Sequence, residues 1–142
     1  MGALCTSRRK IGGRIGPLQQ PADIGASWLN IPKHSFILWL SMLNRIKTKD
    51  RLQYMDLENS KCLLCNIEDE IVPHLFFECS FSLECLEKVK SWLNWGMAAT
   101  TLERIIRWLR RAKISKVKKS ILVDVIAALV YEIWRTRNNI FW

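Results

Sequence analysis

The chain has 142 residues, of which 49% are hydrophobic, so it is long enough for one domain with a core and hardly long enough for two. No apolar run reaches the roughly 20 residues that a membrane span needs, and no secretory signal is visible. The net charge of +9 is uneven: residues 61–100 hold three Lys/Arg against six Asp/Glu, and the segments on either side are basic. We therefore expect an intracellular protein, nuclear or cytoplasmic, that is not secreted and has no membrane partner.

Residues 1–26 are rich in Gly, Pro, Gln and basic residues and show no strand or helix periodicity, so we expect a flexible tail. The basic residues of this tail are Arg8, Arg9, Lys10 and Arg14. They are either simply solvated or contact nucleic acid or a nuclear import receptor. The tail also holds Cys5, for which the sequence indicates no role.

The first strong apolar pattern runs from Trp28 to Ile46, and Pro32 marks the entry to a helix. The predicted buried stripe is Phe36, Trp39, Leu40, Leu43 and Ile46, widened by Leu38 and Met42. We interpret His34, at the start of this helix, as a surface or capping histidine. Thr48 and Asp50 are candidate caps for a short helix through Arg51, Leu52 and Tyr54. Its basic rim consists of Lys47, Lys49 and Arg51.

A metal site is predicted by the spacing Cys62-x2-Cys65-x8-His74-x4-Cys79. Two cysteines separated by two residues can aim both sulfurs at one ion, and thiolates prefer Zn²⁺ to Mg²⁺ or Ca²⁺. The imidazole completes four-coordination and leaves no open position for water. The sequence therefore predicts one structural zinc ion.

Other interpretations of these cysteines stay open. One alternative is that they are ordinary buried thiols beside a satisfied histidine. Another is that Cys62 and Cys65 form a redox pair, although a polar turn precedes them instead of a strand. Disulfides are disfavoured by the odd count of five cysteines and by the missing secretory signal. We interpret Cys85 as a core thiol. The alternative is that Cys85 replaces Cys79 or His74 as a metal ligand.

The residues between the ligands support the metal interpretation. Pro73 suits the first position of a helix, which makes His74 a first-turn residue. Cys79 lies five residues later, about 140° past a full turn, so the helix must loosen or end near Glu78 for both to reach one ion. Asn66 tolerates a left-handed backbone after the first cysteine pair, and Ser80 is a candidate cap for the next helix.

Three further helical segments follow. Ser80 to Trp95 is predicted to bury Phe81, Cys85, Val89 and Trp92 and to stop at Gly96. Thr100 or Thr101 then caps a helix whose inner face is Leu102, Ile105, Ile106, Trp108 and Leu109. Its other face begins a run of eight positive charges without a negative one: Arg104, Arg107, Arg110, Arg111, Lys113, Lys116, Lys118 and Lys119. The last predicted helix, Ile121 to Phe141, is apolar through Ile121, Val125, Ala128, Leu129 and Ile133. The expected fold is mostly α, a small helical domain around a Cys3His zinc knuckle with a C-terminal amphipathic helix pair.

A resemblance to a known family is carried by the runs I-P-K-H-S-F-I-L-W-L-S-M-L-N-R-I-K-T-K-D-R-L, C-L-L-C and H-L-F-F-E-C. Together they resemble the zinc-binding domain of reverse transcriptases from plant non-LTR (LINE-like) retrotransposons, over about residues 28–95. Leu63, Asn66 and Ile46 depart from the usual Pro, Gly and Leu, and none of these departures removes a ligand. The run E-I-W-R-T-R-N-N-I-F resembles the linker that follows this domain in longer relatives.

The resemblance implies a piece of a retrotransposon polyprotein, or a host copy of one. The implied parts are a basic tail (1–26), a reverse-transcriptase-type zinc-binding domain (27–97), and a basic helix with an apolar C-terminal helix (98–142). The sequence contains neither a Tyr-x-Asp-Asp turn nor the acidic constellation of ribonuclease H. We therefore expect a non-catalytic module with no small-molecule substrate.

Two function hypotheses follow. In the first, zinc stabilises a module whose basic helix face binds RNA or DNA phosphates, with Lys47, Lys49 and Arg51 extending the path. In the second, the module is a structural adaptor that packs against a reverse transcriptase or another polyprotein domain and binds no nucleic acid. A third hypothesis, that the protein is a metallohydrolase, is disfavoured because four protein ligands leave no room for a reacting water.

Overall fold

The computed structural model describes residues 31–52 and 59–142. The helices within these ranges are α1 (Pro32–Met42), α2 (Ser80–Trp92), α3 (Leu102–Arg111) and α4 (Lys116–Phe141), with single turns η2 (Lys49–Arg51) and η4 (His74–Glu78). The same residues form no strand, and the one bridge among them pairs Lys61 with Asp69. The prediction of a mostly helical fold is confirmed. The predicted tail, its basic cluster and Cys5, as well as Trp28 and Tyr54, lie outside the described residues.

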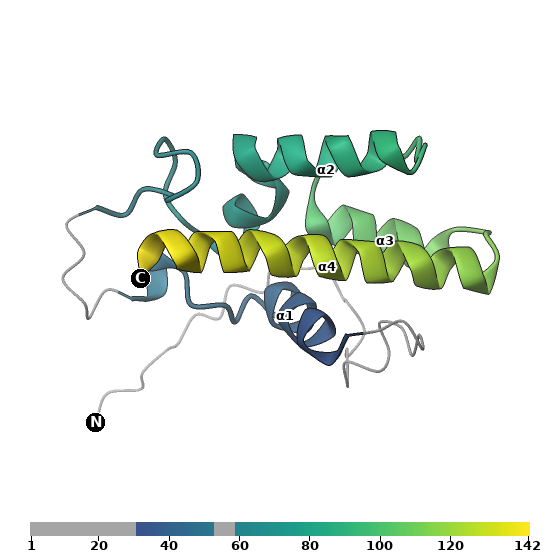
Figure 1. Ribbon diagram of the computed structural model, residues 1–142, viewed down its shortest axis with the longest axis horizontal. Helices are drawn as coiled ribbons and strands as arrows, with labels where there is room; N and C mark the ends of the chain where they lie inside the picture. The colour runs from purple at the N-terminus through teal and green to yellow at the C-terminus, as the bar shows by residue number, and fades with distance from the viewer. Residues whose placement is uncertain (1–30, 53–58) are drawn as a thin grey trace, which may run out of the picture.

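Helix α4 is the central element of the fold. It crosses the length of the molecule, with α1 on one side and α2 and α3 on the other (Figure 1). It packs against α1, α3, α2 and η4, so both halves of the described chain share one core. The apolar side chains at the centre of this core are Leu38, Leu75, Phe76, Phe77, Leu86, Ile105, Ile126, Ala127 and Val130. None of the described helices is long and apolar enough to cross a membrane.

The predicted buried face of α1 is partly wrong. Phe36 is 49% exposed, and the helix buries Ile37 and Leu38. It also ends at Met42, earlier than predicted, because Asn44 takes a left-handed conformation with φ 54°. The reason for the error is that apolar residues follow one another without interruption in the middle of α1, so their spacing does not select one face.

The predicted face of α2 is displaced by one position. Phe81 and Trp92 are exposed, and the buried residues are Ser82, Leu86 and Lys90. These three continue, at helical spacing, the face that begins with the buried Cys79. The helix ends at Trp92, and the left-handed residue after it is Asn94 (φ 48°) and not Gly96.

The inner face of α3 is confirmed, since Leu102, Ile105, Ile106 and Leu109 are buried, although Trp108 is partly exposed. The Thr101 hydroxyl caps the helix by accepting a hydrogen bond from the Arg104 backbone N–H. Helix α4 begins at Lys116, earlier than the predicted Ile121, with Ser115 as its cap. Of its predicted inner residues only Ile133 is buried; the buried set is Leu122, Ile126, Ala127, Val130, Ile133 and Arg137. As in α1, the apolar residues of α4 follow one another almost without interruption, so their spacing does not indicate which face is buried.

Candidate metal centre and basic surfaces

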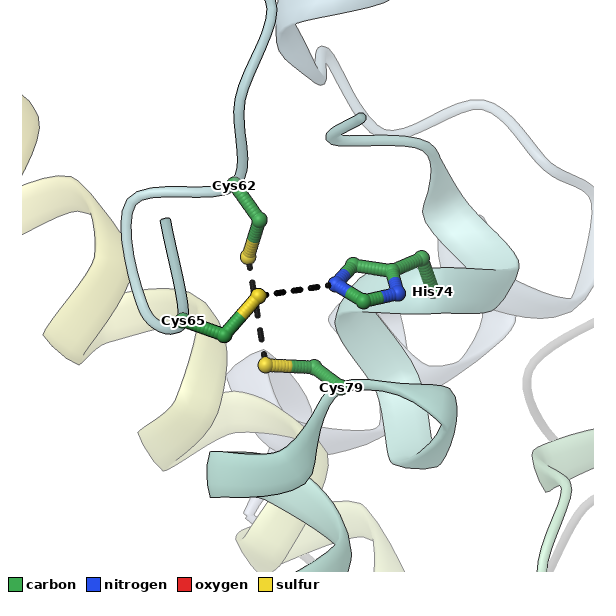
Figure 2. Close-up of side chains that lie close together, drawn as sticks. All are labelled: Cys62, Cys65, His74 and Cys79. Atoms are coloured by element: carbon green, nitrogen blue, oxygen red, sulfur yellow. Dashed lines mark hydrogen bonds between the residues drawn. The ribbon is translucent and has the colours of Figure 1, made fainter. Parts of the chain in front are cut away.

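The first two ligands lie in a tight loop that its own backbone closes. The Cys62 N–H donates to the Glu68 carbonyl at 2.7 Å, and the Asn66 N–H donates to the Cys62 carbonyl at 2.8 Å. Asn66 has a φ of 57°, the left-handed conformation that the sequence predicts there. This reversal of the chain directs both thiols toward the same point (Figure 2).

The other two ligands lie at the two ends of η4, which is not a regular helical turn. Phe76 and Phe77 leave helical geometry, with Phe77 at φ 82°, and the Cys79 N–H donates to the His74 carbonyl at 2.7 Å. The Ser82 hydroxyl accepts from the Phe77 N–H at 3.0 Å and donates to the Cys79 carbonyl at 3.1 Å. The predicted loosening of the helix before Cys79 is therefore present, at Phe76 and Phe77. Ser80 is the first residue of α2, and the cap position belongs to Cys79.

The four ligand atoms form a compact group. The three sulfurs and one ring nitrogen all lie within 4.8 Å of one another. The sulfurs of Cys62 and Cys79 are 3.9 Å apart, and Cys65 Sγ is 3.3 Å from His74 Nε2 (Figure 2). Zn–S bonds of 2.3 Å in a tetrahedron place two sulfurs about 3.8 Å apart, so the group has the size that zinc requires. Cys62, His74 and Cys79 are buried, which suits a closed structural site.

The protein environment treats the two cysteines of the first pair differently. Burial raises the pKa of the Cys62 thiol to about 12, against hydrogen bonds from the backbone of Leu64 and Cys65. Burial also opposes ionisation of Cys65, but the backbone N–H groups of Glu68 and Ile67 and the side chains of His74 and Cys79 outweigh it and lower the pKa of Cys65 to about 6. The proton of Cys62 is therefore harder to displace on zinc binding than the proton of Cys65.

Glu70 makes a buried structural contact that the sequence analysis does not predict. It is fully buried, and Oε1 accepts hydrogen bonds from Arg137 Nε at 3.0 Å, Arg137 Nη2 at 2.5 Å and the Lys49 backbone N–H at 3.0 Å. Arg137 is buried as well, so a salt bridge joins residues 60–72, the zinc loop, to the last turns of α4. No sequence pattern indicates this pair, because Glu70 ends an acidic run typical of a solvated loop and Arg137 is 67 residues away.

The structure places the predicted basic residues in two separate regions. The first, the basic corner, joins the exposed side of α3 to the start of α4 and comprises Arg104, Arg107, Arg110, Arg111, Lys113, Lys116, Lys118 and Lys119. The second lies near the C-terminal end of α4, where Lys47 borders a pocket with Trp134 and Trp142. The distance along α4 between the two regions is about 30 Å, since twenty helical residues separate Lys118 from Asn138.

Lys49 is a correction to the predicted nucleic-acid contacts. Its side chain is buried, and its ammonium group donates to the Lys61 carbonyl at 2.7 Å. It thus ties η2 to the zinc loop instead of pointing to solvent. Lys47 and Arg51 are exposed, and Arg51 lies 3.9 Å from the carboxylate of its neighbour Asp50.

Cys85 and His34 lie apart from the metal group. Cys85 is only partly buried on α2 and does not belong to the buried core, so the prediction of a core thiol is wrong; it is also not among the clustered ligands. The His34 ring lies 4.6 Å from the Tyr131 ring on α4. Burial and the neighbouring Lys33 lower the pKa of His34.

Comparison with known proteins agrees with this geometry. No curated protein and no solved structure matches the chain. Residues 20–85 match the family model described as zinc-binding in reverse transcriptase, a segment that contains all four clustered ligands. The Cys3His group fits one structural zinc, and residues 20–85 are similar to the zinc-binding domain described for reverse transcriptase.

Proposed function

We propose that this protein is a non-catalytic, zinc-stabilised module of a retrotransposon reverse-transcriptase polyprotein, or of a host copy of one, and that its basic corner binds nucleic acid. The family match supports the zinc-binding role and the link to reverse transcriptase. The resemblance to plant non-LTR elements supports an origin in a retrotransposon. The charge and geometry of the basic corner support nucleic acid as its ligand.

The observation that carries the nucleic-acid proposal is the position of the lysines on α4. Lys116, Lys118 and Lys119 lie in its first turn, and that turn holds no acidic residue. The N-terminus of a helix carries partial positive charge, so each lysine there is unfavourable by about 0.3–1 kcal/mol. A merely solvated surface gains nothing from this arrangement, whereas a phosphate backbone is attracted both by the lysines and by the helix end.

The rest of the corner is also available to an anion. Among the described residues the only carboxylate that pairs with the corner is Glu103, which contacts Arg107. Lys119 donates to the Arg110 carbonyl, which holds the two helices together at the turn without neutralising either charge. The corner residues other than Arg107 have no ion pair in the described part of the chain, and all of them except the partly buried Lys119 are exposed.

In this proposal the zinc ion has a structural role. Four protein ligands fill a tetrahedral site, so no position remains for a substrate or a reacting water. The ion fixes the loop and the irregular turn η4, whose side chains Leu75, Phe76 and Phe77 are at the centre of the core. The zinc thus supports the helices that present the basic corner.

The test uses a double substitution that favours the fold while it removes the binding charge. Lys116→Glu with Lys118→Glu places acidic residues in the first turn of α4, where they stabilise the helix. We expect binding to a short DNA or RNA duplex to weaken about tenfold or more, and the slope of log affinity against log salt to fall by about 2. Fluorescence anisotropy at two salt concentrations measures both quantities.

The matched control is Lys88→Glu with Arg135→Glu, which changes the charge equally at exposed positions outside the corner. Affinity and slope equal to those of the control would remove the corner from the binding mechanism. No binding by the native chain at low salt would leave the structural adaptor, which packs against other polyprotein domains.

A further inference from the structure

A pocket of about 520 Å³ lies at the far end of α4 from the basic corner. Its apolar lining includes Leu40 and Ile46, and Trp134 and Trp142 add two large rings. Arg45 and Lys47 also line it. This combination of apolar floor, aromatic rings and cations is typical of sites for planar anionic ligands, and the volume lies in the range of small-ligand pockets.

The cations of this pocket differ in availability. The Arg137 guanidinium is committed to Glu70 and, through Nη1, to the Asn138 side chain at 3.0 Å. Arg45 and Lys47 are exposed and make no ion pair within residues 31–52 and 59–142. The pocket therefore presents two uncompensated positive charges beside apolar surface, which favours a ligand with a phosphate group and a flat apolar part.

Trp142 is 82% exposed, and its ring packs against one neighbouring ring. Its ring meets the Phe141 ring edge-on, with centroids 4.8 Å apart. The Arg137 guanidinium lies 4.6 Å from the centroid of Phe141, and Glu70 fixes that guanidinium from the zinc loop. A series of contacts thus runs from the zinc loop to a solvent-facing indole, which reduces the loss of conformational freedom when a ring stacks on it.

We propose that this pocket binds an unpaired nucleotide of a single-stranded nucleic acid. The base stacks on Trp142, and the adjoining phosphate pairs with Arg45 and Lys47. A duplex does not supply this ligand, because its bases are stacked inside the helix. The proposal relies on the proposed nucleic-acid function for its ligand class, but it rests on different residues, about 30 Å along α4 from the basic corner.

The experiment compares two exposed tryptophans in the full, zinc-loaded chain. Trp142→Ala removes the indole of the pocket, and Trp92→Ala removes one on α2 that is 80% exposed. The probes are a single-stranded 12-mer of mixed sequence and the duplex of the same sequence, at low salt. We expect Trp142→Ala to weaken single-strand binding about tenfold and to leave duplex binding unchanged, because stacking of one base is worth about 5- to 150-fold. Trp92→Ala should change neither.

Lys47→Gln provides a second variant that leaves the rings in place, and it should weaken single-strand binding more than duplex binding. Equal losses for both probes, or no loss with Trp142→Ala and Lys47→Gln while the native chain binds, would overturn the pocket and leave the basic corner standing. If the native chain binds neither probe, the proposed function and the pocket are both wrong.

Discussion

Phe77 has a φ of 82°, which is an unfavourable conformation for a bulky residue without a glycine's freedom. The side chain compensates for this strain by complete burial in the core. The backbone N–H compensates by donating to Ser82, whose hydroxyl in turn donates to the Cys79 carbonyl. This conformation directs Cys79 toward the metal group, so strain at Phe77 lets η4 and the residue after it supply two ligands.

Ser82 is therefore a positioning residue for the metal site. In Ser82→Ala the buried Phe77 N–H loses its partner, and we expect a loss of about 1–3 kcal/mol in the free energy of unfolding. Zinc affinity should fall as well, because Cys79 is no longer held. Urea unfolding and competition with a chelator measure the two effects.

Ser91→Ala is the control for this change, since Ser91 is an exposed residue of the same helix. It should leave stability within about 0.5 kcal/mol and zinc affinity unchanged. If Ser82→Ala behaves like Ser91→Ala, the hydroxyl does not support the irregular turn.

At the scale of the elements, what could be predicted depended on how local the determining contacts are. The four metal ligands lie within eighteen residues, and charged residues separate the apolar ones of α3 at helical spacing, so both were predictable. The faces of α1 and α4 were not, because apolar residues surround each helix and packing against its neighbours selects the face. The buried face of α2 begins with Cys79, and the direction of Cys79 follows from the positive φ of Phe77. No sequence pattern predicts that positive φ.

The contact between the zinc loop and α4 gives a prediction at this scale. Arg137→Met leaves the fully buried Glu70 carboxylate without its charged partner, and we expect a loss of about 3–5 kcal/mol in stability. Adding Glu70→Gln to this variant removes the unpaired charge and should restore part of the loss. Chemical denaturation of the single and double variants measures both.

Arg135→Met serves as the control, two residues earlier on the same helix. Arg135 pairs with Glu132 at 3.0 Å, but both side chains are about half exposed, so the loss should stay below about 1 kcal/mol. A similar small loss for Arg137→Met would show that the buried pair contributes no more than a surface pair.

At the scale of the whole molecule, the metal loop and the C-terminal helices form one structure. Val72, Leu75, Phe76 and Phe77 from the metal segment belong to the same buried cluster as the inner residues of α3 and α4. The run that resembles an inter-domain linker contributes Ile133 and the buried Arg137, so it is part of the fold. The segment that carries the Cys3His group is therefore part of the core that the described residues share, and it does not form an independent finger.

This arrangement predicts that loss of the metal unfolds the described chain as a unit. A structural zinc typically contributes about 10–16 kcal/mol of apparent binding free energy, which equals or exceeds the roughly 5–15 kcal/mol net stability of a domain. Cys65→Ser removes one ligand, so η4 is no longer fixed where it packs against α2 and α4. We expect a large loss of helical circular dichroism and no cooperative thermal transition, including in α3 and α4.

Cys85→Ser changes the same atoms at a thiol outside the metal group, and it should retain one zinc per chain and a cooperative transition. Retention of the α3 and α4 signals in Cys65→Ser, seen as protected amides in hydrogen exchange, would mean that these helices hold together without the metal segment, which the shared core argues against.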